Sequence, residues 1–189
     1  MLNKAVFLDR DGTLNEDPGY LGDPEHLKLF PETGQALALL KNDYNYLLIV
    51  ISNQSGVARG LITKDEVEAV NDEINNQLQK FNVKIDAFYY CPFHPDFNSK
   101  DECSCRKPSP KMILDAAKDL NIDLSSSYII GDTVADVRAG QNAGLKTILV
   151  KTGYGSDSFY ILQKENYLPS FVAENLTDAS KFIIKDFVE

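Results

Sequence analysis

Short apolar runs alternate with amphipathic segments along the chain. The apolar runs, rich in Val, Ile, Leu, Phe and Tyr, have the length and composition of β-strands. We expect strands over residues 4–9, 46–52, 85–90, 127–131 and 146–150. Apolar residues at spacings of three and four predict helices over residues 33–43, 64–81, 109–120 and 134–143. The pair Thr63 and Glu66 is spaced as a capping box at the start of the second helix.

This alternation predicts a doubly wound α/β fold, in which helices cover both faces of a parallel sheet. The nearly continuous apolar run Leu47–Ile51 is typical of a strand buried on both faces. At 189 residues and 43% hydrophobic content, the chain is long enough to bury a core as a single domain spanning residues 1–189. Residues 154–189 predict a loop, a short strand near 170–173 and a closing helix from about 176.

Two carboxylates stand at the end of the first predicted strand. Asp9 and Asp11 are two residues apart, so on an extended chain they converge on one spot. A divalent cation such as Mg²⁺ keeps two neighbouring acids ionised. Gly12 and Thr13 then turn the chain away, at the strand end where ligands bind in open α/β sheets. The alternative is a strand that simply leaves into a polar Asp-Gly turn.

Further polar signals follow the other strands. The turn of residues 52–56 offers a hydroxyl and backbone N–H groups that can hold a phosphoryl oxygen. Asp132 leaves the fourth strand, and Asp136 follows one helical turn later, where it can support the site or complement the helix dipole. Arg106 and Lys107 precede a helix and can neutralise a phosphoryl group. Each of these signals taken alone is also typical of ordinary turns and solvated surface.

Charge and cysteine content limit the partners. The net charge of −9 argues against nucleic acid or an anionic membrane surface as the main partner. No apolar run approaches the length that spans a bilayer, and the N-terminus lacks the pattern of a signal peptide, so we expect a cytoplasmic protein. Three cysteines, Cys91, Cys103 and Cys105, fall in one Pro-rich loop of residues 91–108. Their odd number favours reduced thiols gathered for a metal over a disulfide framework.

Together, these residues resemble the motifs of the haloacid dehalogenase superfamily of phosphohydrolases. The resemblance implies transfer through an aspartyl-phosphate, with Asp9 as nucleophile and Asp11 as general acid and base. It also implies Mg²⁺ held by Asp9, the backbone carbonyl of Asp11 and Asp132, while Ser52 and Lys107 offset phosphoryl charge. The matching segments are Asp9-x-Asp11-Gly12-Thr13, Ser52, Lys107 and Gly131-Asp132-x-x-x-Asp136.

Within that superfamily, the chain resembles the branch of heptose 1,7-bisphosphate and histidinol-phosphate phosphatases. The segments that carry this resemblance are residues 7–15, residues 52–60, Tyr90-Cys91-Pro92 and residues 103–108. It implies substrate contacts from Asn53, Gln54, Arg59, Arg106 and Lys107.

The same branch implies a structural Zn²⁺ in the cysteine loop. Phe93 occupies the position of the expected histidine, and the histidine comes one residue later. Because a Cys-x-x-His pair can also chelate, we expect a zinc site formed by Cys91, His94, Cys103 and Cys105. The alternative is a weakened or empty site with His94 on the surface.

The resulting hypothesis is an Mg²⁺-dependent phosphatase that removes the 7-phosphate of D-glycero-D-manno-heptose 1,7-bisphosphate, on a route to lipopolysaccharide or S-layer heptose. The alternatives are a histidinol-phosphate phosphatase, which acts on an amino alcohol, and a non-catalytic phosphate-binding module. No insertion is long enough for a full cap domain, so we expect an open site. No apolar stripe requires assembly, and we expect a monomer.

Overall fold

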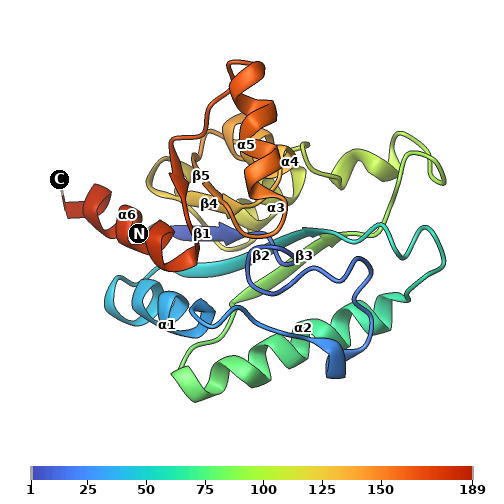
Figure 1. Cartoon of the computed structure of the whole chain (residues 1–189), viewed down its shortest axis with the longest axis horizontal. Helices are drawn as coiled ribbons and strands as arrows, with labels where there is room; N and C mark the ends of the chain where they lie inside the picture. Colours follow the sequence, from blue (N-terminus) through green and yellow to red (C-terminus); the bar gives the residue numbers. More distant parts are fainter. Residues whose placement is uncertain (1, 189) are drawn as a thin grey trace.

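The computed structural model describes residues 2–188 and contains one six-stranded sheet in the order β3-β2-β1-β4-β5-β6 (Figure 1). All neighbouring strands pair in parallel. The predicted doubly wound fold is therefore confirmed. The strands are β1 (Ala5–Leu8), β2 (Leu47–Asn53), β3 (Ala87–Cys91), β4 (Tyr128–Gly131), β5 (Lys146–Val150) and β6 (Phe171–Ala173).

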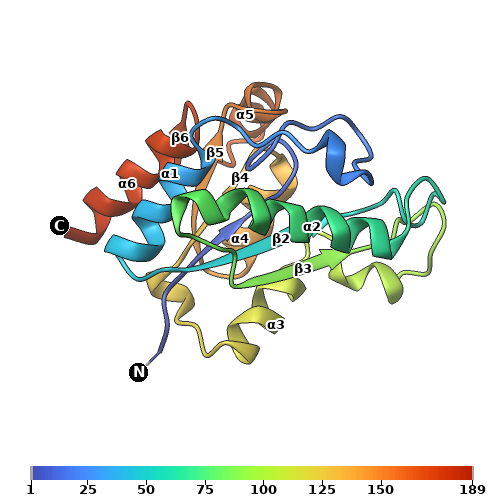
Figure 2. The same cartoon turned by 90° about the horizontal axis from the view of Figure 1, so that it is seen from below.

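Helices cover both faces of this sheet, as Figures 1 and 2 show from two directions. The α-helices are α1 (Thr33–Ala38), α2 (Lys64–Leu78), α3 (Lys111–Asp119), α4 (Val134–Asn142), α5 (Gly155–Lys164) and α6 (Leu176–Val188). Short 3-10 segments are η1 (Pro24–His26), η3 (Gln79–Phe81), η4 (Glu102–Cys105) and η5 (Leu124–Ser126), and a π-helical segment η2 (Leu39–Asp43) continues α1.

The two apolar layers follow from the alternation of side chains along each strand. In β1, Val6 and Leu8 pack with α1, α2 and α6, while Ala5 and Phe7 pack with α3 and α4 on the other face. Because both faces are covered, these strands are apolar throughout. The predicted capping box is present: the Glu66 backbone N–H donates to Thr63 Oγ1 at 3.2 Å.

One predicted loop is a helix. The segment after residue 154 forms α5, which the sequence did not predict because its buried positions are Gly155, Ser158 and Leu162, while Tyr160 and Ile161 are exposed. Small buried residues and exposed apolar residues conceal the helical period. The strand near 170–173 and the closing helix are confirmed as β6 and α6.

In the described residues 2–188, no helix combines the length and the apolar composition that a membrane crossing requires.

Candidate active site

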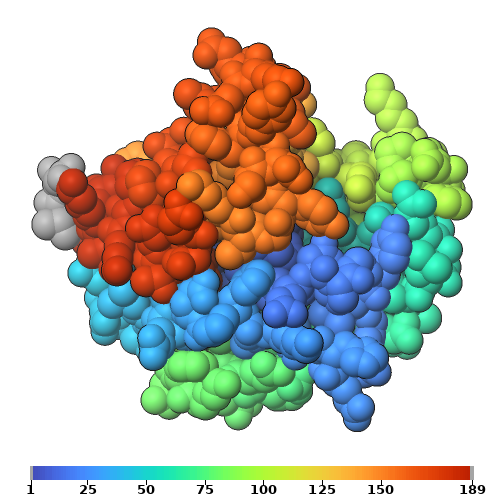
Figure 3. All heavy atoms as spheres, in the orientation of Figure 1, coloured from blue at the N-terminus to red at the C-terminus, as the bar shows by residue number. Residues whose placement is uncertain are grey.

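The carboxyl ends of β1, β2 and β4 open into a pocket of about 300 Å³. Figure 3 shows the surface hollowed between α5 and the loop of residues 92–106. This edge is where the chain order reverses around β1, the usual ligand position in a doubly wound sheet. The predicted site residues that line the pocket are Asp9, Asp11, Ser52, Asn53, Gln54, Arg106, Lys107 and Asp132.

Lys107 connects three elements at the centre of the pocket. Its Nζ lies 2.9 Å from Asp9 Oδ1 and 2.6 Å from Asp136 Oδ1, and it donates to the Ile51 carbonyl at 2.9 Å. Burial alone lowers the pKa of Lys107, but Asp136 and Asp9 raise that pKa above its ordinary value overall. The lysine is therefore a permanent positive charge beside Asp9.

Three buried carboxylates, Asp9, Asp132 and Asp136, have oxygens within 4.8 Å of one another. Burial, with a contribution from Asp136, raises the pKa of Asp9 well above its usual range and that of Asp132 to about 7. Burial is the larger cause and the neighbouring negative charge adds to it, because within residues 2–188 Lys107 is the cation that contacts this cluster. A divalent cation compensates that negative charge, and oxygen donors suit Mg²⁺.

The contacts of Asp136 separate it from the other two carboxylates. One of its oxygens accepts from Lys107, and the other accepts from the Thr133 backbone N–H at 3.0 Å and from the Thr133 hydroxyl. Asp136 thus pairs with Lys107 and closes the capping box of α4. Asp9 and Asp132, the carboxylates that the family resemblance implies as Mg²⁺ ligands, lie beside it in the same cluster.

Backbone geometry keeps space free around Asp132. Gly12 has φ +82°, and a Cβ on it would lie 2.3 Å from Asp132 Oδ2. A residue with a side chain is therefore excluded by both conformation and space. The same carboxylate accepts the Tyr154 backbone N–H at 2.8 Å, a contact that no side-chain pattern could predict.

Asp11 is held by nitrogen donors on both oxygens. The Arg10 guanidinium contacts it at 3.0 to 3.2 Å, and Asn15 Nδ2 and Gln54 Nε2 each donate at 2.9 Å. Both side-chain oxygens of Asp11 therefore accept hydrogen bonds from the protein, and the cation ligand that the family resemblance implies for this residue is its backbone carbonyl. The roles of Arg10 and Asn15 were not predicted from the sequence.

The turn after β2 organises its neighbours. Asn53 Nδ2 donates to the Lys107 carbonyl at 3.2 Å, and Asn53 Oδ1 accepts the Lys107 N–H at 3.0 Å. Gln54 Nε2 also donates to Ser52 Oγ at 2.7 Å, so the Ser52 hydroxyl proton remains available to the pocket. Asn53 and Gln54, predicted to bind substrate, line the pocket and also fix Lys107 and Ser52.

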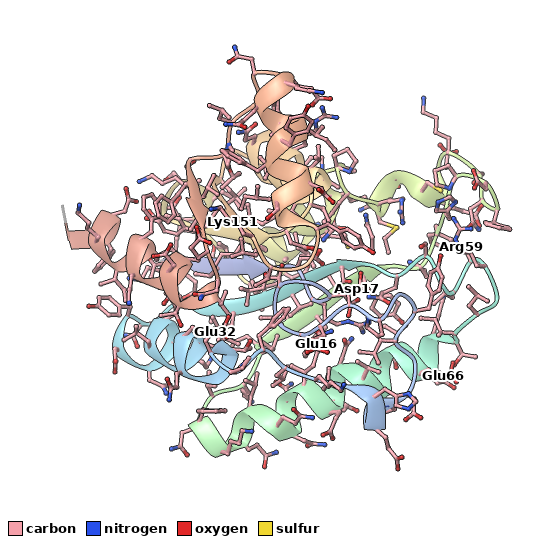
Figure 4. All side chains as sticks on the ribbon, in the orientation of Figure 1. Glu16, Asp17, Glu32, Arg59, Glu66 and Lys151 are labelled. Carbon is pink, nitrogen blue, oxygen red and sulfur yellow. A yellow bond between two sulfur atoms is a disulfide. The ribbon has the colours of Figure 1, made fainter. Side chains whose placement is uncertain are left out.

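The two predicted substrate arginines lie differently. Arg106 lines the pocket and donates to the Phe93 carbonyl at 3.3 Å, and burial lowers its pKa. Arg59 is not among the lining residues: its Nη2 lies 3.1 Å from His94 Nε2, and its guanidinium stacks 5.3 Å from the centre of the Phe97 ring. Figure 4 shows Arg59 beside the loop of residues 92–106, away from Asp17.

The predicted zinc ligands are not assembled. Cys91 and Cys105 form a disulfide, and Cys103 keeps a free thiol. His94 faces Arg59 and accepts the Asp96 backbone N–H on Nδ1 at 3.2 Å. Since zinc binds thiolates, two of the four predicted ligands are unable to bind it in this state, and the structure does not support the zinc prediction. Among residues 2–188, the metal-type cluster is the aspartate group at the sheet edge.

Further walls of the pocket come from residues outside the predicted motifs. Tyr20 and Asp17, both in the loop that follows β1, line the pocket. Burial raises the pKa of Asp17. Thr133, Ala135 and Tyr154 also line the pocket, and their residue types carry no chemical signal that could have identified them.

Comparison with known proteins assigns this arrangement to a family. The HAD-hydrolase-like profile matches residues 104–179. A D-glycero-D-manno-heptose-1,7-bisphosphate 7-phosphatase from Chlorobaculum tepidum is 40% identical over 93% of this chain and 92% of its own. A Pasteurella multocida protein, named as the 7-phosphatase of the β-anomer, is 39% identical over 96% of this chain and 97% of its own.

This chain belongs to the heptose bisphosphate phosphatase family of HAD-like hydrolases. A crystal structure of D,D-heptose 1,7-bisphosphate phosphatase from B. bronchiseptica, complexed with magnesium and phosphate, matches it with a TM-score of 0.85. The two sequences are 31% identical, and the match covers 97% of this chain and 99% of the B. bronchiseptica chain. The predicted membership of this family, and the prediction that the chain is a phosphatase, are confirmed.

Proposed function

We propose that this phosphatase removes the 7-phosphate of D-glycero-D-manno-heptose 1,7-bisphosphate through an aspartyl-phosphate on Asp9. The names of its relatives support the substrate. The observation that carries the mechanism is Lys107, whose Nζ bridges Asp9 and Asp136 beside the buried Asp132. In this proposal Asp9 is the nucleophile, Lys107 is a fixed cation, and Asp9 and Asp132 are the metal ligands; their contacts at one edge of the sheet support these roles.

In the first step, an Asp9 carboxylate oxygen attacks phosphorus, and the bond between phosphorus and the sugar oxygen breaks. The Asp11 carboxyl gives its proton to the departing alkoxide. Lys107 and the Ser52 hydroxyl donate to the phosphoryl oxygens, where charge builds up. The Ser52 hydroxyl is free to donate because Gln54 occupies its acceptor side.

In the second step, water attacks the phosphorus of the aspartyl-phosphate, and Asp11 accepts the proton of that water. The bond between phosphorus and the Asp9 oxygen breaks, which regenerates the Asp9 carboxylate and a protonated Asp11. Mg²⁺, held by Asp9, Asp132 and the backbone carbonyl of Asp11, supplies positive charge to the phosphoryl group when bound.

The remainder of the substrate lies toward the mouth of the pocket. Arg106 offers a cation for the second phosphate, and Asp17 and Tyr20 offer an acceptor and a hydroxyl for the sugar. Arg59 lies beyond the lining residues, so its contact with substrate would require it to release His94. In the same proposal, the enzyme is a single-domain monomer of the cytoplasm.

The zinc site belongs to the reduced protein in this proposal. A reducing cytoplasm opens the Cys91–Cys105 disulfide. Three thiols and His94 then lie on one loop and supply four ligands, which leaves no open coordination position on the metal. Such a site would stabilise the loop that precedes Arg106 and Lys107, and it would take no part in the chemistry.

The test is phosphate release with Mg²⁺ from both anomers of heptose 1,7-bisphosphate and from histidinol phosphate, compared as kcat/KM. We expect a preference of at least about tenfold for a heptose substrate, which corresponds to about 1.4 kcal/mol of differential transition-state binding. A preference for histidinol phosphate would overturn the proposed substrate. If the enzyme hydrolyses none of the three compounds, the proposed function is wrong.

A further inference from the structure

Arg10 lies between the two aspartates of the site and is fully buried. A buried guanidinium is costly unless its donors are paired. Its Nε and Nη2 donate to the two oxygens of Asp11 at 3.1 and 3.0 Å, and its Nη1 donates to Asn71 Oδ1 at 3.2 Å. The arginine therefore connects the Asp11 carboxyl to a residue that is 61 positions away in the sequence.

Asn71 anchors this connection in a rigid element. It is itself buried, in the interior of α2, and its neighbours Val70 and Ile74 pack in the apolar layer beneath the sheet. A side chain on such a helix has little freedom to move, so it fixes the far end of the guanidinium. Nothing in the proposed chemistry requires Arg10 or Asn71 to touch the substrate, and neither residue lines the pocket.

We propose that Arg10, anchored by Asn71, is a positioning residue that holds the Asp11 carboxyl in the orientation for proton transfer to the leaving group. The planar fork of an arginine fixes both carboxylate oxygens at once, which a lysine point charge does not do. Asn15 and Gln54 donate to the same carboxylate at 2.9 Å from other directions. This inference rests on the proposed function, because it assigns proton transfer to Asp11.

Substrates with different leaving groups distinguish a residue that positions Asp11 from a residue that only supports the fold. A sugar alkoxide needs a proton as it departs, whereas 4-nitrophenolate leaves without one. The ratio kcat/KM covers the steps up to this departure. Loss of Asp11 orientation must therefore lower kcat/KM for the sugar phosphate and spare it for 4-nitrophenyl phosphate, while general damage to the fold lowers both.

The experiment compares the two substrates for wild type, Asp11→Asn, Arg10→Lys and Asn71→Ala. The sugar phosphate in this experiment is heptose 1,7-bisphosphate. For Asp11→Asn we expect kcat/KM to fall by about 100-fold or more on this substrate, and by much less on 4-nitrophenyl phosphate. Arg10→Lys should lose at least tenfold more on the sugar phosphate than on the aryl phosphate, and Asn71→Ala should show the same selectivity with a smaller loss. The inhibition constant of inorganic phosphate with Mg²⁺ should stay within about twofold.

Two variants serve as matched controls. Asn75→Ala removes an amide one turn along α2 that holds the Ile85 N–H, and Arg138→Lys alters an exposed arginine paired with Glu165; both should leave the leaving-group ratio unchanged.

Equal losses on both substrates, or no loss, in Arg10→Lys would overturn the inference, provided that Asp11→Asn shows the selective loss. If Arg10→Lys does not fold, Asn71→Ala decides by the same criterion. Failure of the proposed function is distinguishable, because Asp11→Asn would then show no selective loss.

Discussion

Lys107 and Asp136 form an ion pair almost wholly removed from solvent, with Nζ and Oδ1 2.6 Å apart and side chains 2% and 1% exposed. A pair at this depth acts on both stability and chemistry. The pair also holds the lysine beside Asp9: Lys107 Nζ lies 2.9 Å from Asp9 Oδ1. Among the residues that the structure describes, this lysine is the cation paired with the cluster of Asp9, Asp132 and Asp136.

Lys107→Met should therefore destabilise the protein strongly. The variant keeps the length of the side chain but leaves buried carboxylates without their cation, a change that costs about 3–5 kcal/mol of unfolding free energy. Urea unfolding at neutral pH measures it. Lys111→Met is the matched control, because its pair with Asp115 is about half exposed; we expect a change below about 1 kcal/mol. Similar effects in both variants would contradict the assigned role of Lys107.

The stability of the metal-free protein should fall as pH rises toward neutrality. Burial raises the pKa of Asp132 from its ordinary 3.8 to about 7, so between these values the folded state binds more protons than the unfolded chain. The unfolding free energy then decreases with pH, by at most about 1.4 kcal/mol per pH unit for one such group.

Thermal melts between pH 5 and 8 with chelator and with excess Mg²⁺ test this dependence. Mg²⁺ favours the ionised carboxylates and should flatten the decline, and Asp132→Asn should flatten it without metal. A metal-free stability that rises across this interval would contradict the charge imbalance described for the site.

The cysteine loop should exist in two covalent states. Without reductant, the denatured protein should react at the one free thiol of Cys103, and after reduction at all three cysteines. If the reduced loop is the zinc site that we propose, protein purified under reducing conditions should contain about one zinc per chain, and Cys103→Ser should lower that content. A chelator should lower its melting temperature at constant Mg²⁺. Reduced protein without zinc would rule this site out.

Much of the fold was predictable because strands buried on both faces carry continuous apolar runs. Asp9, Asp11 and Asp132 were predictable for a related reason, since a carboxylate directly after such a run lies at the edge where parallel strands end. The helix α5 was not predictable, because the small residues Gly155 and Ser158 lie on its buried side while Tyr160 is exposed to solvent. Gly155 is required there, as a Cβ would lie 1.8 Å from the Val150 carbonyl oxygen.

Contacts between distant segments account for what the sequence did not predict at the site. The pairing of Arg10 with Asn71 depends on how α2 packs against the sheet. The clamp between Asn53 and Lys107 depends on two loops that meet only in the folded chain. The position of Arg59 against His94 is of the same kind. Residue type indicated that these side chains were polar, but only the fold determines their partners.

The proposed mechanism requires that Asp9 carry a phosphoryl group during turnover. The decisive measurement is rapid acid quench of the enzyme with Mg²⁺ and heptose 1,7-bisphosphate, followed by mass mapping of the peptide that contains Asp9. We predict the added mass of one phosphoryl group on that residue during turnover, and neither this mass nor phosphate release in a folded Asp9→Asn variant. An unmodified Asp9 peptide with Asp9→Asn still active would contradict the mechanism.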